Sequence, residues 1–280
     1  EATQGRPVDV MWASPDCTYF SKARGTRPFR DRNFANRRRA LATVIPRWAK
    51  QTRPRVILME NVEEFRAWGP LDANGAPDKA RAGQSFDRWI KRLDNLGYKV
   101  EWRNLTACDF GAPTSRKRLY MVARCDGRPI VWPEPTHGPG LEPYRTAASI
   151  IDWSIAAPSI FERKRPLADA TNRRIARGVV EKVIADPRPY IVDHHTLIQR
   201  SQGELMAKGR KHALVTAYMA RHWGGVEPEL ARPPFSHTGQ VIGFLQKYYG
   251  TGGAVGVDKP LDTLTTKSRF GLVTVEGVDH

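Results

Sequence analysis

The sequence predicts an α/β protein whose amino-terminal half forms an open sheet. Two observations carry this prediction. Short apolar strands alternate with amphipathic helices between residues 8 and 123, and polar residues with reactive side chains follow directly after two of the strands. In open α/β sheets, ligands and chemistry gather beyond the carboxyl ends of the strands. We therefore expect a functional site where Cys17 and Glu60 lie.

The first strand and the first helix are predicted from the spacing of apolar residues. The run VDVMWA at residues 8–13 is typical of a buried strand, and Ser14 and Pro15 form the turn that ends it. Residues 35–51 are predicted to form a helix, in which Pro46 introduces a kink or marks the true start. The apolar positions of this helix lie three and four residues apart, on one face: Leu41, Val44, Ile45 and Trp48.

Three further strands and one helix complete the predicted sheet. The run VILM at residues 56–59 is typical of a second buried strand, and residues 98–106 and 117–123 read as two more. Residues 84–96 are predicted to be helical, and Gly97 stands in the position expected just past a helix end. The apolar residues of this helix also share one face: Phe86, Trp89, Ile90 and Leu93.

The composition changes after residue 123, where prolines crowd the stretch RPIVWPEPTHGPGLEP. Such a stretch indicates a linker or an extended crossover, so we predict one domain at residues 1–135 and another at residues 136–280. The second domain is predicted to contain a helix near residues 167–184, followed by a weak repeat. Its first copy is AYMARHWGG with a later PPFSHT, and its second is GFLQKYYGTGG with a later PLDTLTT. These copies suggest a small paired β/turn module.

Charge and cysteine content indicate a class of partner. The chain has 45 Lys and Arg against 29 Asp and Glu, a net charge of +16, which attracts a polyanion such as nucleic acid. A basic surface without a binding role is the alternative. Three cysteines without C-x-x-C spacing argue against disulfides and a metal site. Because the sequence shows no membrane-spanning run and no signal peptide, we expect a cytoplasmic protein with no membrane partner.

Three segments carry candidate chemistry, and each also has a purely structural explanation. A basic segment follows Cys17 and favours a nucleophilic thiolate, although a buried inert cysteine is the commoner case. Glu60 and Asn61 suit a general acid with a polar support, or a helix-capping pair. The run Arg116–Arg118 suits phosphate and base ligands, or a solvated charge run. Taken singly, each segment favours the structural explanation.

Together, the order and spacing of these segments resemble the DNA (cytosine-5) methyltransferase family, most of all its bacterial and phage-associated branch. SPDCTYFS at residues 14–21 is similar to the nucleophile loop, usually Gly-Pro-Pro-Cys-Gln followed by Phe-Ser. Glu60–Val62 matches Glu-Asn-Val, and TSRKR at residues 114–118 resembles Gln-x-Arg-x-Arg. Asp16 replaces the second proline, and Thr114 replaces the glutamine. The resemblance implies a partial Rossmann-like class I methyltransferase sheet with a smaller target-recognition domain.

The resemblance also implies a role for each matching residue. Cys17 is expected to attack C6 of a flipped cytosine, protonated Glu60 to bind N3 and the exocyclic amine, and Arg118 to contact O2. Asn61, Arg116 and Ser21 are expected to bind substrate or to support the loops. The implied methyl donor is S-adenosylmethionine, the implied substrate is double-stranded DNA, and residues 21–32 are expected to form a loop that closes over the flipped base.

The family's cofactor-binding segment has no match in this sequence. Nothing before Val8 resembles its first strand, glycine-rich loop and ribose-binding acid, and the closing Gly-Asn motif does not appear by His280. We therefore assign no cofactor-binding residue, and we expect little methyl transfer from the 280 residues alone, with the missing segment absent or supplied separately. A tRNA cytosine-5 methyltransferase of the same fold and a non-catalytic DNA-binding remnant remain alternatives. A restriction-modification, phage or orphan role stays open.

Overall fold

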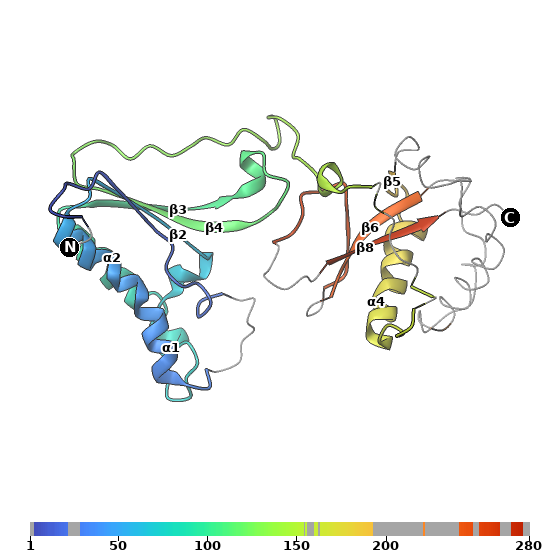
Figure 1. Ribbon diagram of the computed structural model, residues 1–280, viewed down its shortest axis with the longest axis horizontal. Helices are drawn as coiled ribbons and strands as arrows, with labels where there is room; N and C mark the ends of the chain where they lie inside the picture. The colour runs from blue at the N-terminus through green and yellow to red at the C-terminus, as the bar shows by residue number, and fades with distance from the viewer. Residues whose placement is uncertain are drawn as a thin grey trace. The chain divides into compact units, whose positions relative to one another are not determined.

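The computed structural model divides the chain into two compact units, each described here by itself (Figure 1). The first unit is Glu1–Phe110 with Arg116–Glu142, and the second is Gly111–Ser115 with Pro143–His280. The structure describes residues 3–21, 29–153, 155, 160–161, 163–192, 221, 241–248, 252–263 and 270–276.

The first unit is built on a mixed four-stranded sheet with helices packed on it, which confirms the predicted α/β fold class. Its strands are β1 (Val10–Ala13), β2 (Val56–Asn61), β3 (Lys99–Thr106) and β4 (Lys117–Arg124). Its helices are α1 (Arg32–Arg39), η2 (Ala40–Thr43), α2 (Val44–Thr52), η3 (Glu63–Ala67), η4 (Lys79–Arg81), α3 (Gln84–Asp94) and η5 (Ala107–Phe110). The strand order is β1-β2-β4-β3, with β1 parallel to β2 and the other pairs antiparallel. In the described part of the chain, no helix is long and apolar enough to cross a membrane.

The helix predicted at residues 35–51 is in fact three consecutive helices, α1, η2 and α2. The first begins earlier than predicted, because the Asp31 carboxylate caps it by accepting a hydrogen bond from the Phe34 backbone at 2.8 Å. Pro46 lies in the first turn of α2, where backbone N–H groups have no acceptor inside the helix. The prediction that the proline marks a helix start is therefore confirmed, and the single continuous helix is wrong.

The core of the first unit lies between the sheet and the helices on the side of α1 and α2, which Figure 1 draws on one side of the sheet. Ile57 and Met59 of β2 face this core and are fully buried. At its centre, the Phe65 ring lies 5.0 to 5.7 Å, centroid to centroid, from four other aromatic rings: Phe20, Trp68, Phe86 and Trp89. Phe20 follows Cys17 closely, so the aromatic core supports the loop that carries the candidate nucleophile.

Replacing this central ring should destabilise the first unit strongly. Phe65→Ala removes a fully buried side chain and leaves a cavity, so we expect the free energy of unfolding to fall by about 3–5 kcal/mol. The control is Phe34→Ala, because Phe34 is 44% exposed and its loss should cost less than about 1 kcal/mol. Urea denaturation followed by tryptophan fluorescence measures both. Equal losses would show that Phe65 is not the centre of the core.

The first unit extends past the boundary predicted at Pro135 and ends at Glu142. The proline-rich stretch packs back onto the sheet, because the Trp132 indole donates to the Glu101 carboxylate at 3.0 Å. The backbone N–H groups of Thr136 and His137 both donate to the Asp109 carbonyl, at 2.9 and 3.1 Å. The stretch is therefore a crossover that belongs to the first unit, and the boundary is corrected to Glu142.

The second unit contains an antiparallel sheet covered by one helix. Its elements are η6 (Ala147–Ile150), α4 (Asp169–Val179), the π-helical turn η7 (Val180–Ile184), β5 (Ile191–Val192), β6 (Val241–Lys247), β7 (Ala254–Gly256) and β8 (Phe270–Glu276). The central strand β6 pairs with the other three strands. Ile175 and Val179 of α4 pack against Ile242 and Phe244 of β6. The first segment of the predicted second repeat copy begins within β6, and β7 directly follows that segment. The first copy lies outside the described residues except for Arg221.

Part of the third predicted motif belongs to this second unit. Thr114 forms a parallel β-bridge with Leu261, and the Ser115 backbone donates to the Leu261 carbonyl at 2.8 Å. The Ser115 hydroxyl also donates to the Asp262 carboxylate at 3.2 Å. Thr114, the residue that departs from the family pattern, is therefore held by backbone pairing, which a threonine forms as well as a glutamine.

Candidate active site

The candidate nucleophile follows β1, and the candidate acid lies near the carboxyl end of β2, the neighbouring parallel strand. In the register of β1 and β2, Ala13 lies opposite Met59. Cys17 follows the end of β1, and Glu60 is the residue directly after Met59. Because parallel strands place their carboxyl ends at the same edge of a sheet, the loop that carries the thiol and the carboxyl group share one edge. This is the edge at which the sequence predicts chemistry.

Asn61 ties these two strand ends together. Its side chain is fully buried, and its amide nitrogen donates to the backbone carbonyl of Pro15 at 3.0 Å. Its amide oxygen accepts from the backbone N–H of Val62 at 2.9 Å. The helix-capping alternative for this pair is wrong, because Glu60 and Asn61 are strand residues and the next helix has Val62 at its cap, without a side-chain bond. Asn61 instead fixes the start of the Cys17 loop relative to β2.

Cys17 lies in a tight turn and is exposed. Its backbone carbonyl accepts hydrogen bonds from the N–H groups of Phe20 and Ser21, both at 3.0 Å. The alternative of a buried inert cysteine is therefore wrong. Ser21 closes this turn through its backbone, and residues 22–28 of the predicted mobile loop lie outside the described residues.

Arg38 neutralises the acidic residue beside the thiol. The Asp16 carboxylate accepts hydrogen bonds from Arg38 Nε at 2.7 Å and from the Thr18 backbone at 2.8 Å. Burial by itself raises the pKa of Asp16, but the bonds from Thr18 and Arg38 outweigh it and leave the pKa lowered. Asp16 thus remains ionised, with its charge compensated from α1. This pairing could not be predicted from the sequence, since Arg38 is one of three consecutive arginines.

Removing Arg38 should therefore make Cys17 less reactive. Arg38→Ala leaves the Asp16 charge uncompensated beside the sulfur, which disfavours the thiolate. Because Arg38 is 45% exposed and solvent screens the pair, we expect iodoacetamide to label Cys17 more slowly by at most about five-fold, equivalent to about 1 kcal/mol. Site-resolved mass spectrometry separates this label from that of buried Cys108. Arg92→Ala, another exposed arginine, is the control, and an equal effect there would contradict this role for Arg38.

Glu60 and Arg118 form a partly buried ion pair across β2 and β4. Arg118 Nε lies 3.2 Å from Glu60 Oε1, with the two side chains 15% and 24% exposed. The neighbouring Lys117 ammonium lies 3.4 Å from the Glu63 carboxylate. The structure thus brings together Glu60 and Arg118, two of the three predicted catalytic residues. Arg116 is exposed, and its backbone carbonyl accepts a hydrogen bond from Ala107 at 2.9 Å.

Arg39 lies behind the nucleophile loop and was not predicted from the sequence. It is only 3% exposed, its guanidinium stacks 5.2 Å from the centroid of the Phe20 ring, and its Nε has no hydrogen-bond partner. Burial lowers its pKa to about 10, so the side chain is still charged at neutral pH. A buried cation therefore supports the ring that follows Cys17. Its position four residues after the buried Ala35, on the same face of α1, is the signal that could have found it, and the run of three arginines conceals this spacing.

Comparison with known proteins identifies the family. Residues 2–142 match the family model described as C-5 cytosine-specific DNA methylase. The chain belongs to this family. The Type II methyltransferase M1.HphI of Haemophilus parahaemolyticus is 35% identical over 133 residues, which cover 47% of this chain and 32% of the relative. M.SacI of Streptomyces achromogenes is 33% identical over 133 residues, 48% of this chain and 30% of the relative. M.AquIA of Picosynechococcus is 30% identical over 165 residues, 54% of this chain and 63% of the relative.

The extent of these matches determines which part of the chain is assigned to the C-5 cytosine-specific DNA methylase family. This chain covers about a third of the length of M1.HphI and of M.SacI. The family-model match at residues 2–142 contains most of the first unit, up to its last residue, Glu142, together with Gly111–Ser115 of the second unit. It contains all three sequence motifs. The methylase family is therefore established for the unit that carries Cys17, Glu60 and Arg118.

Proposed function

We propose that this chain activates cytosine for DNA (cytosine-5) methyl transfer, with Cys17 as the nucleophile. The observation that carries the proposal is the Asn61 bridge, which fixes the Cys17 loop beside the end of β2, the strand that contains Glu60. Family membership supports the reaction class. Because the Cys17 loop and Glu60 share one sheet edge, a single base bound there can contact both the thiol and the carboxyl group. The substrate is a cytosine flipped out of double-stranded DNA, because its reacting atoms are covered inside the duplex.

The reaction begins with covalent addition to the ring. The Cys17 thiolate adds to C6, and the electron pair of the C5–C6 bond moves towards C5 as an enamine-type system. Protonated Glu60 binds N3 and the exocyclic amine, and Arg118 binds O2, so both stabilise the charge that develops on the ring. C5 can then accept a methyl group. Loss of the C5 proton and release of the thiolate restore the aromatic base and the enzyme.

The ion pair between Glu60 and Arg118 adds a step to this scheme. Arg118 Nε lies 3.2 Å from Glu60 Oε1, so each side chain occupies the other before the base arrives. As the base enters, Arg118 moves its contact from Glu60 to cytosine O2. The Glu60 carboxyl group is then available to N3 and the exocyclic amine. Arg118 is therefore assigned substrate binding.

The methyl donor in this proposal is S-adenosylmethionine. The described residues do not fit it, because none of their strands is followed by a glycine-rich turn that opens a helix. We therefore assign it no residue of this chain and derive no step through it.

We assign DNA recognition to the second unit. Its described part carries exposed basic side chains on α4 and on the segment before it: Arg163, Lys164, Arg165, Arg173 and Arg177. Such a cluster suits the phosphate backbone, whose contacts fix the register of a protein on DNA. The net charge of +16 supports the same partner.

Exchange of the C5 hydrogen tests the proposal without a methyl donor. After sulfur adds to C6, C5 takes up a solvent proton, and loss of the original hydrogen followed by the thiolate returns cytosine. Duplex DNA that carries 5-tritiated cytosine should therefore release tritium in the presence of the 280-residue chain. If tritium release does not exceed that of a heat-denatured control, the chain is the non-catalytic DNA-binding alternative. Faster release from tRNA than from DNA would instead identify the tRNA methyltransferase alternative.

A further inference from the structure

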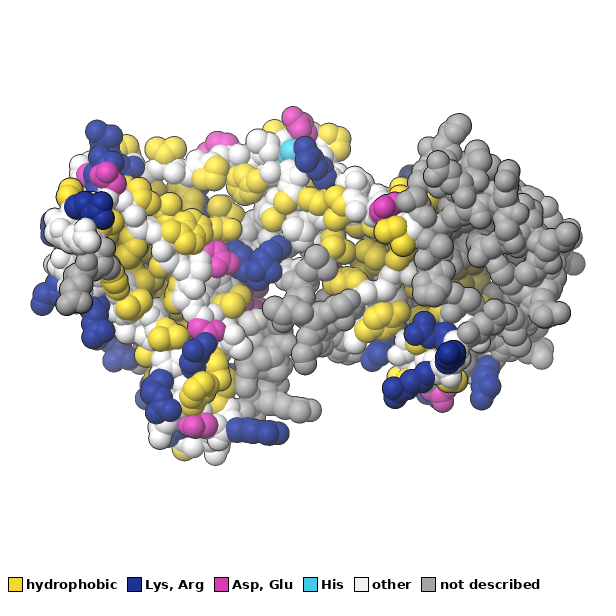
Figure 2. Space-filling view, in the orientation of Figure 1, with side chains coloured by type: hydrophobic (Ala, Val, Ile, Leu, Met, Phe, Trp, Pro, Cys, Tyr) yellow, Lys and Arg dark blue, Asp and Glu magenta, His cyan; other side chains and the backbone are white. Residues whose placement is uncertain are grey.

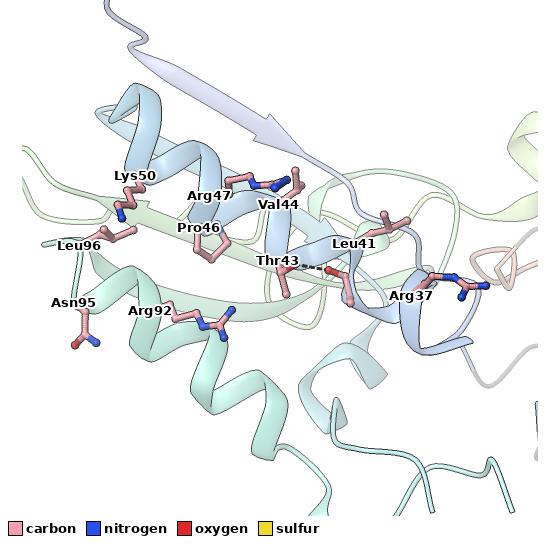
Figure 3. Close-up of a pocket in the computed structure, with 11 residues that line it drawn as sticks. Arg37, Leu41, Thr43, Val44, Pro46, Arg47, Lys50, Arg92, Asn95 and Leu96 are labelled. Carbon is pink, nitrogen blue, oxygen red and sulfur yellow. Dashed lines mark hydrogen bonds between the residues drawn. The ribbon is translucent and has the colours of Figure 1, made fainter. Parts of the chain in front are cut away.

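A groove on the helical side of the first unit gathers cationic side chains. It has a volume of about 700 Å³ and lies between α2 and α3, with one end at α1 (Figure 3), and we call it the α2–α3 groove. Its described lining contains no carboxylate but four cations: Arg37 of α1, Arg47 and Lys50 of α2, and Arg92 of α3. A cleft lined by charges of one sign focuses the electric field and concentrates counter-ions. The groove therefore favours an anionic occupant.

The four groove cations differ from many other basic residues of the first unit, which are paired. Within the described residues, none of the four forms an ion pair with a carboxylate. Elsewhere in this unit, ion pairs join basic side chains to acidic ones: Arg38 to Asp16, Arg66 to Asp87, Arg81 to Asp78, Arg118 to Glu60 and Arg124 to Asp126. Because like charges around one groove repel each other, a bound anion lowers the electrostatic energy of this surface.

The α2–α3 groove also has an apolar lining. Pro46 is buried there, Leu96 is half-buried, and Leu41 and Val44 are 43% and 42% exposed. Figure 3 draws Pro46 directed towards α3, and Arg92 on the side of α3 where α2 lies. On the visible face of the first unit, hydrophobic and basic side chains likewise lie next to one another (Figure 2). The occupant therefore needs apolar groups as well as negative charges.

Nucleic acid and a second copy of the chain fit this lining less well. A DNA duplex offers phosphates without apolar groups, and it is too wide to enter a groove between packed helices, whose axes are usually about 8–10 Å apart. Single-stranded nucleic acid is held by aromatic side chains that stack on its bases, and the described lining contains no aromatic residue. Two chains of charge +16 repel each other. The lining instead fits a polypeptide with acidic and apolar side chains.

We propose that the α2–α3 groove binds an acidic amphipathic helix of a partner protein. Amphipathic helices bind such grooves through an apolar stripe of residues three and four positions apart. Arg37 and Lys50 lie 13 residues apart along three consecutive helices, which is about 20 Å or roughly four turns of a bound helix. Acidic residues on both sides of the stripe would pair with the four cations. The inference is independent of the proposed methyl-transfer chemistry, because none of the groove residues is assigned to it.

A defined peptide tests this inference. The probe is a synthetic, fluorescently labelled peptide of about 16 residues, with leucines three and four positions apart and glutamates on both sides of that stripe. Fluorescence anisotropy should show saturable one-to-one binding to the 280-residue chain. A peptide of the same composition, with its leucines spread around the helix, should bind at least ten-fold more weakly. Equal binding of both peptides would show that net charge alone attracts them, which overturns the inference.

Paired substitutions in the chain locate the binding site. Lys50→Gln with Arg92→Gln removes two groove cations and should weaken peptide binding by roughly five-fold, the effect of two partly exposed ion pairs. The matched control is Lys79→Gln with Arg88→Gln, at two exposed cations of the same unit outside the groove, which should leave the affinity within two-fold. Val44→Asp places an anion in the apolar lining and should weaken binding at least ten-fold. Circular dichroism shows whether each variant is folded.

The possible outcomes separate the occupants. Absence of peptide binding overturns the inference, and so does a loss that the groove pair and the control pair share equally. If the groove pair lowers the affinity for duplex DNA more than the affinity for the peptide, the groove binds phosphates instead. A dimer of the chain alone that the groove pair abolishes, seen by sedimentation velocity, would identify a second copy as the occupant. Tritium exchange by the groove pair should equal that of the wild type, so failure of exchange refutes the proposed function alone.

Discussion

Cys17→Ser should abolish exchange of the C5 hydrogen, with tritium release from duplex DNA falling by roughly 10³-fold or more. The serine hydroxyl is far less ionised than the thiol and a weaker nucleophile, so the C6 adduct that makes C5 reactive does not form. Cys17 is exposed and its loop is held by backbone bonds to its own carbonyl, so the substitution leaves the fold unchanged. The measurement compares initial rates of tritium release at equal protein concentration.

Cys125→Ser is the matched control for this prediction. It makes the same chemical change at a half-buried thiol whose hydrogen bond to the Pro54 carbonyl a hydroxyl can replace. Its rate should stay within a factor of about two of the wild-type rate. Retention of exchange by Cys17→Ser would mean that another group attacks the ring. The parallel strand ends would then have no catalytic role.

Glu60→Gln should lower the exchange rate by roughly 10²- to 10⁴-fold, which is the usual contribution of a general acid. The amide keeps the shape of the side chain and can still form hydrogen bonds to the base. Unlike a protonated carboxyl group, it cannot transfer a proton to N3. The substitution also removes the ion pair with Arg118. Because Arg118 is then free to contact the base, DNA affinity should not fall in proportion to the rate. Single-turnover exchange at saturating DNA isolates the chemical step.

Glu63→Gln is the control that tests whether the lower exchange rate is specific to Glu60. It neutralises the neighbouring carboxylate, which pairs with Lys117 at 3.4 Å, but it leaves Glu60 in place. We expect its exchange rate to stay within about three-fold of wild type, in line with the small value of exposed ion pairs. If both variants lose exchange rate equally, the effect comes from the overall charge of this sheet edge. A specific role of Glu60 would then be excluded.

Much of the first unit could be predicted because its signals are local. The runs at residues 56–59 and 117–123 became β2 and β4, and Gly97 ends the α3 region with a positive φ of 83°. These features depend on residues only a few positions apart. Residues 35–51 are predicted as one helix for the same reason, since apolar spacing alone shows neither the earlier start that Asp31 caps nor the 3-10 turn η2 that separates α1 from α2.

The sequence by itself determined the family of this protein and the residues that carry its three motifs, because each motif is a short run of fixed order. Only the tertiary structure decided what those residues touch: Asn61 bridges to Pro15, Arg38 neutralises Asp16, and Arg118 pairs with Glu60. Each of these contacts joins residues from different elements. The distances between these side chains depend on strand order, register and helix packing, which arise when distant segments bury their apolar faces together. A local sequence pattern therefore does not predict these distances.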